Sequence, residues 1–407
     1  MRRKVIGFSL VLLAAAALRL WNLATPNELV FDEVYYVDGA RDYLAGGVEV
    51  SDGKPEFVVH PPLGKWAIAA GIALGGDNSF GWRISSAIAG TLAIALIFLV
   101  ARRLFTSYAI ALGAAILSTV DGLHLVMSRT ALLDIFLALF ILAAFLAILY
   151  ERHFLAALAL GAALATKWSA AYFIIAIGIY LIARYRRELW KYFVIVPSIY
   201  LISWSGWFLS DKGWSRDSNT NPLIALWNYH REILGFHTGL TEDHSYEASP
   251  WNWLLLGRPT SFFYASPTSC GANSCSQEIL ALGTPLLWWG GAIAIVITLG
   301  YFISRRERVA GLILLALGAN FLPWFLFPER TTFYFYAIAF QPFLILAICY
   351  VASKFFEAPE TQARRQQIAT SALGLTVLCF AYFLPLYIGS VLTYDDWYAR
   401  MWLPSWI

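Results

Sequence analysis

Long apolar stretches alternate with short polar connections along nearly the whole chain. Apolar runs of roughly 20 residues are typical of helices that cross a membrane, and the pattern predicts eleven such spans. Their expected ranges are 5–24, 79–101, 106–121, 130–150, 154–166, 168–183, 192–210, 285–303, 309–327, 333–353 and 368–390. The fifth range is short, so we expect it to be tilted or continuous with its neighbours. The pattern predicts an all-α polytopic membrane protein with a single transmembrane domain over residues 1–407.

Composition agrees with this class. Of the 407 residues, 59% are hydrophobic and 14% are charged, and the mean hydropathy is +0.62. The formal net charge of +3 gives no indication of a nucleic-acid partner. Lys and Arg gather in alternate connections, for example at 102–103, 184–191 and 305–308. By the positive-inside rule the N-terminus is cytoplasmic, and eleven spans then put the C-terminus outside the cytoplasm. The first span lacks a clear cleavage site, so we expect it to stay as an anchor.

Two segments on the outer side are long. The first covers residues 25–78, and the second covers residues 211–284. In the second, Cys270 and Cys275 flank Gly-Ala-Asn-Ser and could form a small disulfide outside the cytoplasm, although two free thiols are the alternative. No Cys/His spacing indicates a zinc site, and no phosphate-binding loop of the Walker type is present.

The first outer segment carries an acidic pair, Asp32 and Glu33, just beyond the first span. A carboxylate there could take a proton from an incoming hydroxyl, whereas two acids alone could simply mark a solvated loop. Residues 34–44 follow with the pattern of an amphipathic helix lying along the membrane surface.

Several cations lie within or beside the spans, where charge is costly. Arg83, Lys167 and Arg330 stand at outer ends of spans, where they could bind an anionic group or anchor the helix at the interface. Arg129 could pair with Asp121. For Arg19 and Asp134 the simpler interpretations are snorkelling and helix packing.

Aromatic and histidine side chains recur in the second outer segment. They suit a polar-aromatic binding surface, although membrane-interface anchoring explains many of the Trp residues equally well. The set comprises Trp214, Trp227, Tyr229, His230, His237, His244, Trp251 and Trp253.

A base near a hydroxyl acceptor, with cations converging on an anion, suits glycosyl transfer from a lipid phosphate-sugar. The departing phosphate is weakly basic, so one carboxylate base and cationic stabilisation suffice. Glycoside hydrolysis differs, because two carboxylates normally share that reaction.

The chain resembles the protein O-mannosyltransferase family of the GT-C glycosyltransferase class, in its bacterial and particularly actinobacterial form. The resemblance covers nearly the whole chain, and it depends on the order of several short motifs. They are Phe31-Asp32-Glu33-Val34-Tyr35-Tyr36, His60-Pro61-Pro62-Leu63-Gly64-Lys65, Trp82-Arg83-Ile84-Ser85, Ser128-Arg129-Thr130-Ala131-Leu132-Leu133-Asp134, Thr166-Lys167-Trp168, the loop from Ser249-Pro250-Trp251 to Trp288-Trp289, and Tyr398-Ala399-Arg400-Met401-Trp402.

The resemblance implies a GT-C fold and an inverting transfer of mannose from polyprenyl-phosphate mannose to Ser or Thr of a secreted protein. The site would face outward from the plasma membrane, with the secretion channel as a candidate partner. Asp32 would be the base and Glu33 its partner in acceptor binding. Arg83, Lys167, Arg330 and Arg129 would bind the donor phosphate.

The resemblance also implies that His60 and Lys65 shape the first outer segment around the acceptor. No metal or other cofactor is implied, although the acidic pair could attract a divalent ion. The second outer segment leaves no room for the sugar-binding trefoil domain of eukaryotic members. After Arg330 the sequence Thr331-Thr332-Phe333-Tyr334 departs from the eukaryotic pattern, which weakens that one assignment.

Two alternatives stand beside this interpretation. Another GT-C transferase would share the fold and the base but modify a lipid or glycan. A transporter would use buried charges as an ion path, but transporters often show two related halves with charge at the midplane, and this sequence shows neither feature.

Overall fold

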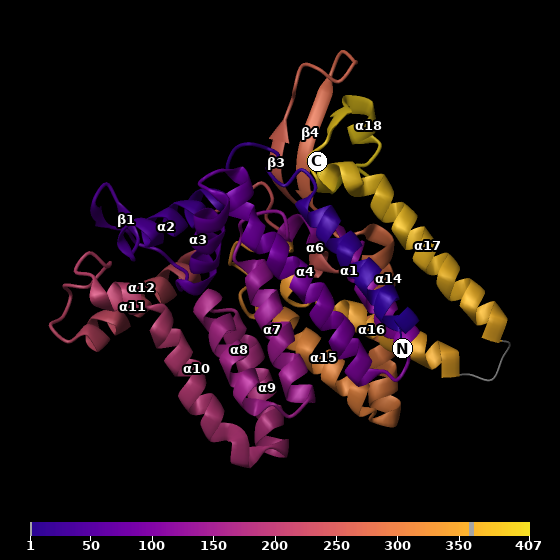
Figure 1. The fold of residues 1–407 in the computed structure, drawn as a ribbon, viewed down its shortest axis with the longest axis horizontal. Coiled ribbons are helices and arrows are strands. Elements are labelled where there is room, and N and C mark those ends of the chain that lie inside the picture. The colour runs from indigo at the N-terminus through magenta and orange to yellow at the C-terminus, as the bar shows by residue number, and fades with distance from the viewer. Residues whose placement is uncertain (1, 358–361) are drawn as a thin grey trace.

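A bundle of helices forms the body of the protein in this computed structural model, which describes residues 2–357 and 362–407 (Figure 1). Residues 1 and 358–361 of the expected domain lie outside the described residues. Helix occupies each of the eleven expected ranges. The bundle comprises α1 (Arg2–Leu20), α4 (Ser79–Leu104), α5 (Tyr108–Thr119), α7 (Asp134–Leu149), α8 (His153–Thr166), α9 (Ala170–Arg184), α10 (Leu189–Ser203), α11 (Ser205–Leu209), α14 (Pro285–Arg305), α15 (Arg308–Phe321), α16 (Gln341–Glu357) and α17 (Gln362–Tyr387).

Short 3-10 helices complete three of these ranges or their connections. They are η1 (Arg186–Glu188), η2 (Leu322–Leu326) and η3 (Tyr334–Ala339). Within the described residues, four helical segments are long and apolar enough to cross a membrane, namely Ser79–Leu104, Pro285–Arg305, Arg308–Leu326 and Gln362–Tyr387. Six shorter apolar helices accompany them. The protein therefore has the character of a membrane protein.

Helices α7 and α16 occupy the centre of the bundle. Helix α7 packs against α4 and α8, while α16 packs against α5, α14 and α15. Both are apolar nearly all round, and residues 343–347 of α16 are completely buried, as expected for a helix enclosed by others. Outer helices instead expose large apolar side chains, such as Ile179 on α9 and Val296 on α14. Such an exposed apolar surface is suited to contact with lipid.

The first outer segment folds over one end of the bundle. It contains α2 (Glu33–Gly46), the two-residue strands β1 (Val50–Ser51) and β2 (Lys54–Pro55), and α3 (Leu63–Gly75). In the second outer segment, α12 (Pro222–Gly239) packs close to it, because the Tyr229 hydroxyl bonds both the N–H and the carbonyl of Val58. Tyr229 is buried, so it belongs to this interface and not to an open binding surface.

The remaining outer elements form a small sheet with short helices. Strands β3 (Thr260–Ala265), β4 (Cys275–Ala281) and β5 (Val391–Thr393) pair antiparallel in that order. Around them lie α6 (Gly122–Met127), α13 (Pro250–Trp253), α18 (Tyr394–Tyr398) and η4 (Pro404–Trp406). Cys270 and Cys275 form a disulfide at the β3–β4 connection. Figure 1 shows the sheet and the C-terminus at the opposite end of the bundle from the N-terminus.

Candidate active site

The acidic pair stands at the start of α2, where the backbone is sharply turned. Phe31 has φ of +49°, a left-handed conformation that is unfavourable for a bulky residue. Its ring is held in place by three aromatic neighbours from two segments. Ring centroids lie 4.7 Å away at Phe262, 5.5 Å away at Phe335 and 5.9 Å away at Phe333. This packing fixes the turn from which the side chain of Asp32 departs.

The Asp32 carboxyl is partly buried and has few partners. Tyr36, one turn along α2, donates a hydrogen bond to it, and the charges of Lys167 and Asp134 act on it. Burial raises the pKa of Asp32 to about 6, although Lys167 and the Tyr36 hydrogen bond oppose this shift. A carboxyl with a pKa close to neutral is well suited to accept a proton during a reaction.

Lys167 is the cation whose charge acts on the Asp32 carboxyl. It ends α8, and its Nζ lies 2.9 and 3.0 Å from the two carboxylate oxygens of Asp134, at the start of α7. The Nζ also stands 4.5 Å from the centroid of the Tyr336 ring. Burial disfavours the charge, but Asp134 outweighs it and the pKa of Lys167 is raised. Lys167 therefore stays protonated.

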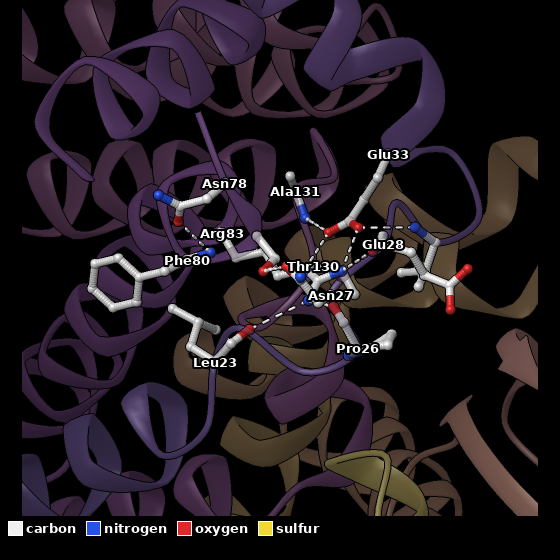
Figure 2. Close-up of polar contacts among 12 residues, drawn as sticks. Leu23, Pro26, Asn27, Glu28, Glu33, Asn78, Phe80, Arg83, Thr130 and Ala131 are labelled. Carbon is white, nitrogen blue, oxygen red and sulfur yellow. Dashed lines mark hydrogen bonds and ion pairs between the residues drawn. The ribbon is translucent and has the colours of Figure 1, made fainter. Parts of the chain in front are cut away.

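Glu33 forms a completely buried ion pair with Arg83, here called the clasp (Figure 2). Both carboxylate oxygens of Glu33 lie 2.8 Å from the Arg83 guanidinium, and they also accept the backbone N–H groups of Val30 and Ala131. The hydrogen-bond acceptor positions of Glu33, expected to take part in acceptor binding, are thus occupied within the protein.

The hydrogen-bonding groups of Arg83 are also fully occupied. Besides Glu33, it donates to the backbone carbonyls of Leu23, Pro26 and Glu28, so all five N–H groups are used. Figure 2 shows these carbonyls gathered around the guanidinium. The side chain is 1% exposed. The guanidinium of Arg83, expected to contact a donor phosphate, therefore has no N–H group left for one in this structure.

Arg129 also has a role within the fold. Its guanidinium donates to the carbonyls of Leu18, Arg19, Trp21 and Asn22, and so satisfies the free carbonyl groups at the end of α1. The guanidinium that the sequence assigned to the donor phosphate is thus bonded to backbone carbonyls. It does not pair with Asp121, whose carboxylate instead accepts from Thr284, Trp288 and Gln341.

Arg19 does not snorkel towards the interface. It is completely buried and bonds the carbonyl of Ala15 and the ring of His124. Lys65 is likewise buried, in an ion pair with Glu49, which also accepts from Tyr43. This pair joins α3 to the end of α2, so Lys65 shapes the first outer segment from within. It does not line a surface open to an acceptor.

A cavity of about 440 Å³ opens beside Lys167. Its walls come from α9, α10, α12 and the 322–336 segment, and its polar lining combines cations with histidines. Two cations (Lys167 and Arg330) and three histidines (His60, His230 and His237) line it. Asp32 lies behind this wall, connected through Tyr36, whose ring centroid is 6.0 Å from that of His60.

Arg330 differs from the saturated arginines. Its Nε donates to the carbonyl of His237 and one Nη1 hydrogen to that of Thr331, which leaves three N–H groups without a partner among the described residues. The guanidinium lies 5.6 Å from the centroid of Trp324. A planar, partly unsatisfied cation on a cavity wall is well suited to an anionic ligand.

Sequence reasoning missed several residues of this region. Asp134 had packing as its simpler interpretation, and the 33 positions between it and Lys167 gave no signal of their contact. His230 and His237 were among the expected binding-surface residues and do line the cavity, whereas Trp253 is buried and Trp251 is 76% exposed elsewhere. Within residues 2–357 and 362–407, no group of three or more His, Cys, Asp or Glu side chains could hold a metal ion.

The clasp generates a prediction about stability. Arg83→Met leaves the Glu33 carboxylate buried without its cation, and we expect it to lower the free energy of unfolding by about 3–5 kcal/mol. Adding Glu33→Gln should recover part of this loss, because the unpaired charge is gone. Arg41→Met is the matched control, since Arg41 pairs with Asp38 and Asp77 in an exposed position and should change stability by less than about 1 kcal/mol. Unfolding midpoints in detergent measure all three. An Arg83→Met protein as stable as wild type would return Arg83 to the candidate anion ligands.

Family models match nearly the whole chain. The model described as "Dolichyl-phosphate-mannose-protein mannosyltransferase" matches residues 9–79 and 59–207, and "C-terminal four TMM region of protein-O-mannosyltransferase" matches residues 223–406. The polyprenol-phosphate-mannose–protein mannosyltransferase of Mycolicibacterium smegmatis is 32% identical over 96% of this chain and 91% of its own length. That of Corynebacterium glutamicum is 32% identical over 93% and 88%.

Solved structures share the fold at low identity. The Saccharomyces cerevisiae protein O-mannosyltransferase Pmt1–Pmt2 complex bound to the sugar donor superposes with a TM-score of 0.84 at 15% identity, covering all of this chain and 93% of that one. ArnT from Cupriavidus metallidurans bound to undecaprenyl phosphate gives 0.60 at 16% identity, over 94% and 76%. These likenesses agree with the GT-C fold expected from the sequence. From the family models and the relatives that align over almost its full length, this chain belongs to the protein O-mannosyltransferase family.

Proposed function

We propose that this protein transfers mannose from a polyprenyl-phosphate mannose to Ser or Thr hydroxyls of protein acceptors, with inversion at the anomeric carbon. The observation that carries the proposal is Asp32, a carboxyl with a raised pKa on which the charge of Lys167 acts, while Lys167 itself lines a cavity together with a second cation, Arg330. The names of the relatives supply the sugar and the acceptor class.

Asp32 is the general base in this proposal. It takes the proton from the acceptor hydroxyl while that oxygen forms its bond to the anomeric carbon and the bond from that carbon to the phosphate oxygen breaks. The electron pair leaves with the polyprenyl phosphate. Tyr36 orients the Asp32 carboxylate through its hydrogen bond, and the Phe31 turn holds it in place.

Lys167 and Arg330 hold the donor phosphate. Both line the cavity, and Arg330 has N–H groups that no described residue accepts. Positive charge held in advance where the leaving phosphate gains charge lowers the barrier. Apolar residues of the same wall, among them Leu164, Leu234 and Phe327, would contact the first isoprene units of the lipid. Arg83 and Arg129 hold the fold around this site and do not contact the donor.

The transfer requires no metal or other cofactor in this proposal, because the two cations supply the positive charge that a metal would otherwise bring. A divalent ion on the acidic pair would need Glu33, and the Glu33 carboxylate is bonded within the clasp.

Transfer of labelled mannose from polyprenyl-phosphate mannose to a Thr- and Pro-rich peptide tests the activity. We expect transfer by the wild type, also in the presence of a chelator, and a loss of about 10²–10⁴-fold in Asp32→Asn, since general bases contribute in that range. Asp38→Asn, the same change on the exposed face of α2, should keep the wild-type rate.

Three results would count against the proposal. Equal rates for wild type and Asp32→Asn would remove Asp32 as the base. Loss of transfer with a chelator, restored by a divalent ion, would establish a metal requirement. A folded wild type without transfer to the peptide would favour a GT-C transferase with a different sugar or acceptor.

The pH dependence of the rate provides a second test. Asp32 accepts a proton only when ionised, and its pKa is about 6. The value of kcat/KM should therefore fall about tenfold per pH unit below 6 and become level above 7. Lys167→Met removes a charge that lowers the pKa of Asp32 and leaves Asp134, which raises it, so the inflection should move to higher pH. An inflection near 4 in both proteins would mean that the group titrating is a solvated carboxyl and not Asp32.

We further propose that the protein crosses the plasma membrane eleven times with its site outside the cytoplasm, where secreted acceptors emerge and the secretion channel is a candidate partner. The basic connections support a cytoplasmic N-terminus and an outer C-terminus. Alkaline phosphatase fused after Ile407 should be active, because it folds only outside the cytoplasm, whereas a fusion within residues 184–191 should be inactive. The reverse pair of results would invert the topology.

A further inference from the structure

Three histidines line the cavity beside Lys167 and Arg330, but their ring nitrogens are not equivalent. In His230, Nδ1 bonds the carbonyl of Leu226, 2.7 Å away, and Nε2 lies 2.6 Å from the hydroxyl of Tyr200. Both nitrogens are therefore used within the protein. A carbonyl accepts only, so Nδ1 carries the proton and Nε2 accepts from Tyr200.

His237 has one nitrogen to spare. Its Nε2 lies 2.9 Å from the carbonyl of Val59 and must donate to it, because a carbonyl has no proton to give. In the neutral ring Nδ1 is then a lone pair, and it has no hydrogen bond within the described residues. Burial, together with the charges of Arg330 and Lys167, lowers the pKa of His237 to about 4 although the hydrogen bond to Val59 opposes the shift, so the ring is neutral at physiological pH.

His60 has an unpartnered ring nitrogen. Its Nδ1 is buried and has no hydrogen-bond partner among the described residues. The ring centroid lies 5.3 Å from that of His237, on the same cavity wall. Burial and the charge of Lys167 lower the pKa of His60 well below its ordinary value. A neutral ring offers one N–H donor and one lone pair. A buried polar atom without a partner is costly, which points to a ligand that satisfies it.

The chemistry of these free atoms selects the ligand. An ionised phosphate diester has no proton to donate, so the lone pairs of His237 and His60 would repel it. A sugar hydroxyl both donates and accepts, and neighbouring hydroxyls on a hexose match a donor and two acceptors on adjacent rings. The cations suit the phosphate, and the neutral histidines suit the hydroxyls.

The order of groups in space agrees with this division. Lys167 and Arg330 lie on the cavity wall, His60 and His237 share that wall, and the ring of His60 adjoins Tyr36, which bonds Asp32. A sugar joined to a phosphate at these cations would therefore lie in the same cavity as the histidine pair.

We propose that His60 and His237 hydrogen-bond the hydroxyl groups of the donor hexose and so set the affinity for its sugar. The proposal rests on the donor site proposed above. It adds a sugar subsite to the phosphate subsite in the same cavity, and it gives His60 a role towards the donor where the sequence indicated the acceptor.

The test compares two ligands, polyprenyl-phosphate mannose and polyprenyl phosphate without sugar, by equilibrium binding to the purified full-length protein in detergent. We expect His60→Phe to lower the affinity for the mannosylated ligand about tenfold and to leave the affinity for the sugar-free ligand unchanged. His60→Asn, which retains a donor and an acceptor, should lose less.

Two controls separate the subsites. His230→Phe makes the same substitution on the same wall, but its nitrogens are already bonded, so the ratio of the two affinities should stay at the wild-type value. Arg330→Gln removes a charge and can still bond the His237 carbonyl, so it should weaken both ligands by the same factor.

Several outcomes would overturn the proposal. Equal weakening of both ligands by His60→Phe would mean that His60 shapes the cavity only. No change in either affinity would exclude contact with the donor, and a change confined to the KM of the acceptor peptide would assign His60 to the acceptor. If His60→Phe fails to fold, a wild-type affinity ratio in His237→Phe would be equally decisive. A wild type that binds neither ligand would instead refute the donor site itself.

Discussion

The buried ion pair between Glu33 and Arg83 determines how the outer end of the bundle is assembled. It joins the loop after α1, the start of α2, the start of α4 and the connection before α7, because the Glu33 carboxylate also accepts from Val30 and Ala131. Desolvating two charges costs several kcal/mol each, and only complete hydrogen bonding offsets it. All five guanidinium hydrogens and both carboxylate oxygens are used, so the pair admits few other arrangements of these segments.

The clasp explains why two adjacent carboxyls have different roles. Glu33 accepts four hydrogen bonds from three residues and is completely buried, whereas Asp32 has the Tyr36 hydroxyl and the nearby charge of Lys167. The same contrast separates Arg83, with no N–H to spare, from Arg330, which has three N–H groups without a partner among the described residues. Residue type alone does not decide whether a charged group serves structure or chemistry. What decides is how many of the group's hydrogen-bonding positions the fold leaves free, because a reacting group must keep some of these positions free.

The sequence predicted the positions of the helices well, because apolar runs of the right length form helices wherever they are removed from water. It also located the acidic pair and the cations of the outer side. It did not predict their pairing. Glu33 and Arg83 are 50 positions apart, Asp134 and Lys167 are 33 apart, and Arg129 caps a helix that ends more than 100 positions earlier. Partners so distant depend on how the helices pack, and no local pattern records that packing.

Hydrogen-bond geometry shows which histidine nitrogens are bonded and which are free, a difference that the positions of the histidines in the sequence do not reveal. His230 and His237 are two turns apart on α12 and face the same cavity, yet among the described residues one has both nitrogens bonded and the other has one free. Burial, aided by the cations of the cavity, lowers the pKa of His60 and of His237, so these neutral rings retain the lone pairs that a hydroxyl requires. In the proposed donor complex the positive charge would have two effects on one ligand. It would attract the phosphate directly, and it would help burial to hold the neighbouring imidazoles in the protonation state that can recognise a sugar.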